Sequence, residues 1–153
     1  MMRMLFIKES VIAASVQEVF AFHERPDAFA LLQPPWERAE ILLAPRSLEV
    51  GTIVKLRTKL GPLWIDVVAQ HVAYEKNVRF EDVMTQGPFA KWHHRHLFFA
   101  DAAGCSLRDE IDFEPPLGLL GRLAAPVAVI PRLRRMFDYR HEITQREVLA
   151  AHG

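Results

Sequence analysis

The amino-acid sequence predicts an α+β domain in which one curved, antiparallel sheet of seven strands is covered on one face by a long C-terminal helix. The chain has 153 residues, half of them apolar, which is enough to bury one sizeable core. Short apolar stretches separated by turn residues fill the middle of the chain and favour antiparallel neighbours. A long stretch of helical spacing occurs only near the C-terminus. We therefore expect residues 1–153 to form a single domain.

The N-terminus is predicted to form one strand and two short helices. Residues 5–12 contain β-forming side chains interrupted by two charges, which is typical of a strand. Ser15 is a suitable N-cap, and Glu18, three residues later, completes a capping box ahead of an apolar segment. Pro26 fits the first turn of a second helix, which should end before Pro34.

Six further strands are predicted between residues 39 and 114, each bounded by residues with turn chemistry. They comprise residues 39–44, 52–60, 63–73, 78–84, 90–100 and 105–114. In the second of these segments, mostly apolar side chains at even positions from Val54 to Leu60 alternate with basic side chains at odd positions. One face of the sheet should therefore be buried while the other faces water.

The C-terminal helix is predicted to cover the buried face of the sheet. Its apolar stripe includes Leu133, Phe137 and Ile143, and Arg140 lies on the same side. Pro131 fits the first turn of this helix. The preceding residues 117–130 should be helical but interrupted at Pro126, and we expect them to lie at the entrance to the space between helix and sheet.

Composition excludes several classes of protein. Nineteen basic and nineteen acidic residues cancel, and no long basic run occurs, so nucleic acid is not an expected partner. Cys105 is the only cysteine, which excludes an internal disulfide and is typical of a reducing compartment. No apolar run approaches the about 20 residues that a membrane helix needs, and charge at Lys8 interrupts any signal-like core. We therefore expect a cytoplasmic protein without membrane insertion.

The strongest functional signal lies in residues 87–98, which read GPFAKWHHRHLF. As a strand, this segment places Trp92, His94, His96 and Phe98 on one face and leaves His93 on the opposite, solvated face. An ordinary dry core avoids such a mixture of large rings and hydrogen-bonding groups, whereas a small-molecule cavity needs it. The pattern therefore predicts a pocket.

Carboxylates on the two neighbouring strands are predicted to face these histidines. Pairing the last two strands around residues 101–104 places His96 opposite Asp109. A similar hairpin around residues 86–88 brings Asp82 near Trp92 or His94, depending on a two-residue register that the sequence leaves open. The resulting polar band lies on an otherwise apolar surface and consists of Asp82, His94, His96 and Asp109, with Arg140 of the helix within reach.

Three interpretations of this polar band are open. The four side chains can satisfy one another as a buried network that holds the strand register and docks the helix. They can instead bind the polar end of a ligand whose apolar body lies against the aromatic rings. Catalysis or metal binding is the third interpretation, but the pair of histidines on a strand lacks a helical two-histidine motif. We therefore expect neither a metal nor a cofactor.

The order of elements resembles the helix-grip fold of the START-like or SRPBCC superfamily. Short motifs in matching order strengthen the resemblance: Val19-Phe20, Phe80-Glu81-Asp82, Gly87-Pro88-Phe89, the segment from Trp92 to Phe98, Leu107-Arg108-Asp109, Pro116-Leu117-Gly118 with Gly121, and Phe137-Asp138-Tyr139-Arg140. Together they are similar to a bacterial branch of cyclase/dehydrase-like and ligand-binding proteins, some of which are fused to nucleotide-sugar-epimerase-like domains. No Rossmann-type glycine fingerprint follows the first strand here, so no dinucleotide site is expected.

The resemblance implies a fold more specifically than a function, because the superfamily includes lipid carriers, hormone receptors, polyketide aromatases and cyclases, and chaperone activators. We expect this protein to bind a hydrophobic small molecule, lipid-, polyketide- or aromatic-like, between the sheet and the C-terminal helix. The expected binding residues are Phe80, Asp82, Met84, Trp92, His94, His96, Phe98, Asp109, Phe137 and Arg140. Room for the ligand is expected beside the small residues Ala69, Ala90 and Ala100.

Two alternatives come from different classes of protein. One is an aromatase/cyclase- or dehydratase-type enzyme, for which His94, His96 and Asp109 are the candidate catalytic residues. The other is a protein-interaction domain with a filled core. The sequence leaves the oligomeric state open, a homodimer included.

Overall fold

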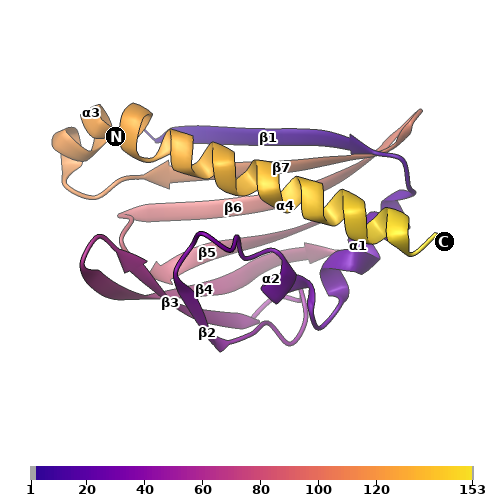
Figure 1. The fold of residues 1–153 in the computed structure, drawn as a ribbon, viewed down its shortest axis with the longest axis horizontal. Coiled ribbons are helices and arrows are strands. Elements are labelled where there is room, and N and C mark those ends of the chain that lie inside the picture. The colour runs from indigo at the N-terminus through magenta and orange to yellow at the C-terminus, as the bar shows by residue number, and fades with distance from the viewer. Residues whose placement is uncertain (1–2, 153) are drawn as a thin grey trace.

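The computed structural model describes residues 3–152, and within them it contains one seven-stranded sheet and four helices (Figure 1). The strands are β1 (Met4–Ile12), β2 (Ala39–Leu43), β3 (Ile53–Leu60), β4 (Leu63–Glu75), β5 (Arg79–Gln86), β6 (Lys91–Asp101) and β7 (Gly104–Glu114). The helices are α1 (Val16–Glu24), α2 (Ala28–Leu31), α3 (Gly118–Ala128) and α4 (Ile130–Ala150). The order across the sheet is β1-β7-β6-β5-β4-β3-β2, with every neighbouring pair antiparallel. The predicted α+β architecture of a helix-grip fold is confirmed.

The two short helices between β1 and β2 have clear local causes. The Ser15 hydroxyl accepts a hydrogen bond from the Glu18 backbone N–H at 3.1 Å, so the predicted N-cap of α1 is confirmed. The prediction that Pro26 lies in the first turn of α2 was wrong, because that helix begins only at Ala28. Arg25, directly before the proline, is extended, since a proline ring excludes helical backbone from the preceding residue. The proline therefore ends α1 instead of starting α2.

The interruption predicted near Pro126 separates α3 from α4. Pro126 lies within α3, where it lacks the N–H that would bond to the preceding turn, and the helix ends two residues later. Pro131 then occupies the first turn of α4. This helix crosses the sheet in front of β1, β7 and β6, and α1 lies near its C-terminal end (Figure 1).

Packing beneath α4 forms a core with two centres. Near α1, Phe20 packs edge-on against Phe98 of β6 with ring centroids 4.9 Å apart. Near the start of α4, Phe137 packs against Phe6 of β1 in a cluster that includes the buried Phe113. The concave face over β1 and β7, and around Phe98 of β6, is therefore filled by large side chains.

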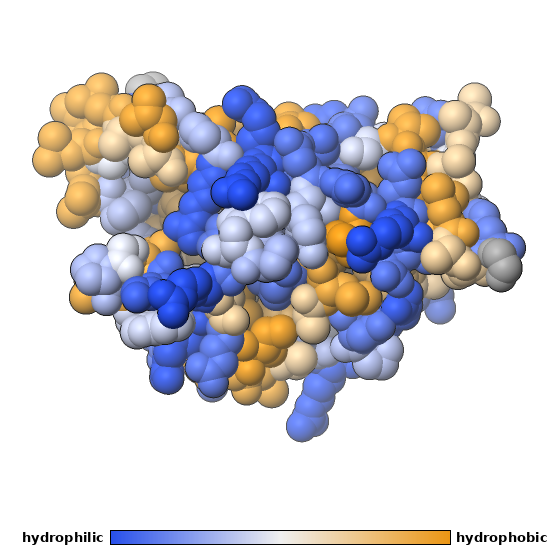
Figure 2. Space-filling model, in the orientation of Figure 1, coloured by the Kyte–Doolittle hydropathy of each residue, from blue (hydrophilic) through white to orange (hydrophobic). Residues whose placement is uncertain are grey.

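The surface of α3 is unusually apolar. Figure 2 shows hydrophobic residues gathered at the end of the molecule where this helix lies. The exposed fraction is between 66% and 80% for five side chains at or in this helix: Leu117, Leu119, Leu120, Leu123 and Val127. No helix within residues 3–152 is both long and apolar enough to cross a membrane.

Candidate functional site

A cavity of about 560 Å³ lies on the concave side of β3 to β6, beneath the α1–α2 segment and the connection from β2 to β3. The predicted location between the sheet and the C-terminal helix is therefore corrected, because α4 contributes Arg140 alone to the wall. Most of its wall is apolar, with side chains such as Leu32, Val54, Leu56 and Met84. Its volume falls within the roughly 300–1,000 Å³ that is usual for small-molecule sites. The protein-interaction alternative requires a filled core. The structure instead has an open cavity in its interior.

The structure brings seven of the ten predicted binding residues to the cavity wall. They are Phe80, Asp82, Met84, Trp92, His94, His96 and Arg140. Phe98, Asp109 and Phe137 lie outside the wall and are buried in the packed half of the sheet. Phe98 and Asp109 share the concave sheet face with the wall residues, and Phe137 lies on the buried side of α4, but α1 and α4 pack over that part of the sheet and fill the space beside all three.

The cavity opens at a different place from the one predicted. Its exposed wall residues are Glu24, Pro26, Ala44 and Arg46, whereas no residue of 117–130 takes part. The physical reason is that α3 lies beyond the start of α4, at the opposite end of that helix from α1 (Figure 1). The expectation for residues 117–130 was therefore wrong.

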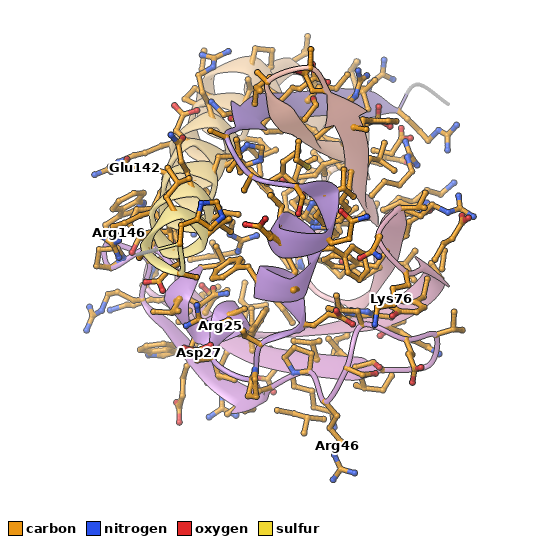
Figure 3. The ribbon with its side chains drawn as sticks, turned by 90° about the vertical axis from the view of Figure 1, so that its right-hand side faces the viewer. Arg25, Asp27, Arg46, Lys76, Glu142 and Arg146 are labelled. Atoms are coloured by element: carbon orange, nitrogen blue, oxygen red, sulfur yellow. The ribbon has the colours of Figure 1, made fainter. Side chains whose placement is uncertain are left out.

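An ion-pair cluster borders the opening. Arg25 bonds Asp27 at 2.6 Å and reaches Glu147 of α4 at 3.2 Å, which ties the segment after α1 to the C-terminal helix. Figure 3 shows Arg25 and Asp27 together beside the base of α1, whereas Arg46 projects away from the protein. Of the three alanines expected to leave room, Ala69 lines the cavity, but Ala90 and Ala100 are exposed.

The predicted register around the histidines is confirmed. His96 is the cross-strand partner of Asp109, and Asp82 is the partner of His94, one of the two registers that the sequence left open. The two β6 imidazoles lie close together, with ring centroids 3.7 Å apart. Both point toward carboxylates, so the polar band exists as a connected cluster.

Asp109 is the centre of this cluster. Its Oδ1 atom lies 2.7 Å from His94 Nε2 and 3.0 Å from His96 Nδ1, and its Oδ2 atom lies 2.6 Å from His141 Nε2. An ionised carboxylate can only accept, so each of these ring nitrogens donates an N–H. Burial alone would raise the pKa of Asp109, but these three donors hold it well below its usual range.

Sequence reasoning missed His141, which α4 contributes to the cluster. Its Nδ1 atom lies within hydrogen-bonding distance of the Ser10 hydroxyl, at 2.8 Å, so the imidazole links β1, α4 and β7. The residue follows Phe137 by four positions, which places it on the buried stripe of the helix. That spacing was a signal that could have found it.

His96 is held between two carboxylates at the cavity wall. Its Nε2 atom lies 3.3 Å from Asp82 Oδ2, while its Nδ1 atom faces Asp109. Burial opposes a charge on this imidazole, but bonding to Asp109 and Asp82 raises the pKa of His96 above its usual value. Burial and the neighbouring His96 instead lower the pKa of His94. The pKa values of the two imidazoles are therefore shifted in opposite directions, so His96 holds an added proton more readily than His94.

Asp82, His94 and His96 could also hold a metal ion, because one ligand atom from each lies within 4.8 Å of the others. A proton on His96 Nε2 satisfies Asp82 without any ion. The hydrogen bonds of these side chains are satisfied without a metal ion, and their spacing would also allow one. The expectation of no metal stays a prediction.

Arg140 occupies a different part of the wall. The sequence placed it within reach of the carboxylates, but no carboxylate of residues 3–152 lies within 4.0 Å of its guanidinium. Its Nε donates to the Leu32 carbonyl at 3.1 Å, and the group stacks over the Phe137 ring at 5.0 Å. Burial lowers the pKa of Arg140, yet a guanidinium keeps its proton at neutral pH.

Two other side chains take no part in the site. Cys105 is buried, which raises the pKa of its thiol to about 11 and makes it a poor nucleophile. His93 lies on the opposite sheet face, as predicted, but it is half-buried and bonds Glu81 at 2.8 Å instead of facing water alone.

Comparison with known proteins identifies the family. Residues 12–136 match the family described as polyketide cyclase / dehydrase and lipid transport. No curated protein sequence matches the chain. The fold is similar to that of the protein TTHA0849 from Thermus thermophilus, with a TM-score of 0.75 at 14% identity, covering 98% of this chain and 100% of that one.

Two further solved structures share the fold. A point mutant of Thalictrum norcoclaurine synthase, in complex with a transition-state analogue, has a TM-score of 0.73 at 15% identity and covers 99% of this chain and 98% of its own. A nucleoside-diphosphate sugar epimerase from Corynebacterium glutamicum has a TM-score of 0.70 at 22% identity, covering 94% of this chain but only 29% of its own. Because the family match spans most of its length, the chain belongs to the polyketide cyclase / dehydrase and lipid transport family.

Proposed function

We propose that this protein binds a largely apolar small molecule in the cavity between β3–β6 and the segments that follow α1. The observation that carries the proposal is the cavity itself, about 560 Å³ in volume and lined mainly by aliphatic and aromatic side chains. Polar side chains, including His96 and Arg140, interrupt this lining, and a mainly apolar wall with polar groups that orient the ligand is the usual composition of a ligand site. The description of the family, which includes lipid transport, supports the same interpretation.

Titration with Nile red, a neutral apolar dye, tests this proposal. We expect saturable binding with a rise in fluorescence, because the dye would leave water for an apolar wall. Ala69→Phe fills the cavity and should abolish that binding, whereas Ala90→Phe places the same ring on the exposed surface and should not. Ala69→Leu is the milder variant if the larger ring prevents folding. Absence of saturable binding, or equal effects at both positions, would contradict the proposal.

Acid–base catalysis on the bound molecule is a second candidate, favoured by the position of His96. This imidazole lines the cavity and is held between Asp82 and Asp109, which is the kind of environment in which a general acid is found. The protein should then speed deuterium exchange at the carbon between the carbonyls of a β-diketone, observed by NMR. His96→Gln should remove the exchange and keep Nile red binding. Exchange equal to that in buffer would exclude this candidate.

A further inference from the structure

We propose that the cavity selects an apolar carboxylic acid, with the carboxylate held by the guanidinium of Arg140. This inference rests on the proposed function, because it names the chemical class of ligand that the same cavity takes. The carboxylate would lie against Arg140, and the hydrocarbon body would lie along the aliphatic and aromatic wall formed by residues such as Met84 and Phe80.

The first observation is that most of the donors of Arg140 are unused. A guanidinium has five N–H groups, and the one on Nε bonds the Leu32 carbonyl. Within residues 3–152, no protein acceptor bonds either Nη atom, and no carboxylate lies within 4.0 Å. Arg140 lines the cavity, and within residues 3–152 no fully buried side-chain nitrogen lacks a partner, so the unbonded Nη atoms are accessible to a ligand.

Most other arginines are either paired with a carboxylate or exposed to water. Those with a carboxylate within hydrogen-bonding distance are Arg25, Arg57, Arg79, Arg95, Arg108 and Arg132. Arg46 and Arg134, for which the structure shows no such bond, are exposed instead. A half-buried cation facing an apolar cavity is costly without a counter-charge. Arg25, Arg95 and Arg108 are about as buried as Arg140, and each of them bonds a carboxylate, whereas Arg140 does not.

The two carboxylates near Arg140 already accept hydrogen bonds from other side chains. Asp109 accepts from three imidazoles, and Asp82 accepts from His96. Neither can turn toward Arg140 without leaving these donors unpaired in a buried site, which is costly. A carboxylate brought by the ligand meets no such competition.

The guanidinium is also held in a fixed orientation. Stacking on Phe137, which is 1% exposed, and the bond from Nε to the Leu32 carbonyl restrain both the plane and the rotation of the group. A planar fork restrained in this way can form two parallel N–H···O bonds with a carboxylate at little cost in side-chain entropy. An alcohol or ester of the same chain offers neither the charge nor the second oxygen in that geometry.

Displacement of Nile red by a matched pair of competitors tests the inference. Dodecanoic acid and 1-dodecanol share the hydrocarbon chain and differ in the head group. At pH 8, below the micelle concentration of the acid and the solubility limit of the alcohol, we expect the acid to bind the wild-type protein about tenfold or more tightly than the alcohol. Equal displacement by the two compounds would overturn the inference and leave the proposed function standing.

Two variants assign the preference to Arg140. Arg140→Met keeps the length of the side chain but not its charge, so this variant should bind dodecanoic acid no more tightly than dodecanol. Arg146→Met removes an arginine from the exposed outer side of α4 (Figure 3) and should keep the preference. If Arg140→Met does not fold, Arg140→Lys keeps the charge but not the bidentate geometry and should reduce the preference. If the Arg140→Met variant still prefers dodecanoic acid to dodecanol, the inference is overturned. If neither Nile red nor dodecanoic acid binds the wild-type protein, the proposed function and this inference both fail.

Discussion

His141 on α4 donates its Nε2 hydrogen to Asp109 on β7 across 2.6 Å, so one buried hydrogen bond joins the C-terminal helix to the sheet. The same carboxylate accepts from two imidazoles on β6. Asp109 is therefore behind the cavity wall and holds His94 and His96 in position without reaching the cavity itself. This arrangement combines two of the interpretations that the sequence left open, because a buried network supports part of the candidate site.

Replacing Asp109 should strongly destabilise the fold. We expect Asp109→Asn to lower the free energy of unfolding by about 3 to 5 kcal/mol, because the amide lacks the negative charge and replaces one of the two acceptor oxygens that serve the three imidazoles with an N–H donor. Urea denaturation at pH 7 measures the change. Asp138→Asn is the control, since Asp138 is 55% exposed and pairs with Lys8 at the surface. That variant should change stability by less than about 1 kcal/mol. Equal effects of the two substitutions would contradict this account of the cluster.

Truncating Phe137 tests whether α4 is docked as described. The ring is 1% exposed and packs against Phe6 and His94. Phe137→Ala should destabilise the protein by about 3 to 5 kcal/mol, the usual cost of removing a buried aromatic ring. Calorimetry should show a lower melting temperature, while Arg134→Ala, on the exposed side of the same helix, should melt close to the wild type. An unchanged melting temperature for Phe137→Ala would rule out the docking.

Removing Trp92 should weaken binding of an apolar probe. This side chain lines the cavity and is supported by Phe89, with ring centroids 4.9 Å apart. Trp92→Ala should reduce Nile red affinity by about fivefold or more, because a buried aromatic anchor is typically worth more than about 1 kcal/mol. The adjacent Lys91 is exposed and points to the other face, so Lys91→Ala should have little effect. Fluorescence titration measures the Nile red affinity of both variants, and equal losses at the two positions would contradict this role of Trp92.

Acid should destabilise the protein through His23, which lies among aromatic rings beside His96. Burial lowers the pKa of His23 from the ordinary 6.5 to about 4. Between these values the unfolded chain binds a proton that the folded protein does not, so the free energy of unfolding falls as the pH falls. The difference of roughly 2.5 pH units corresponds to about 3 kcal/mol lost by pH 4.

The effect can be assigned by substitution. His71 and His94 also have lowered pKa values because of burial, so they act in the same direction. His23→Phe removes one titrating group and should flatten the decline in stability between pH 6.5 and pH 4, as measured by urea denaturation. A decline as steep as that of the wild type would show that His23 is protonated in the folded protein.

Register was predictable because it depends on neighbours in the sequence. A short turn after residue 101 and the two-residue repeat of a strand were sufficient to pair His96 with Asp109. The same reasoning left two choices for Asp82, since the longer connection after β5 allows a shift by two residues without moving any side chain to the other face. Local rules therefore located the polar band before any tertiary contact was known.

The cavity wall was only partly predictable because it depends on volume. Phe98 and His96 share one face of β6. Phe20 of α1 covers Phe98, whereas His96 borders the cavity. Nothing in the alternation along the strand distinguishes these positions. The exposed entrance at Pro26 and Arg46, far in sequence from β6, was likewise invisible to local patterns.

By itself the sequence determined the strands, the antiparallel pairing of those joined by short turns, and the side of the sheet on which each histidine of β6 lies, because backbone periodicity and turn chemistry act over a few residues. Only the tertiary structure decided that His141 completes the buried cluster, that Asp109 lies behind the wall and that Arg140 faces the cavity without a carboxylate. Those outcomes follow from how a helix packs across a sheet, where the space that remains is set by side chains that are distant in the chain.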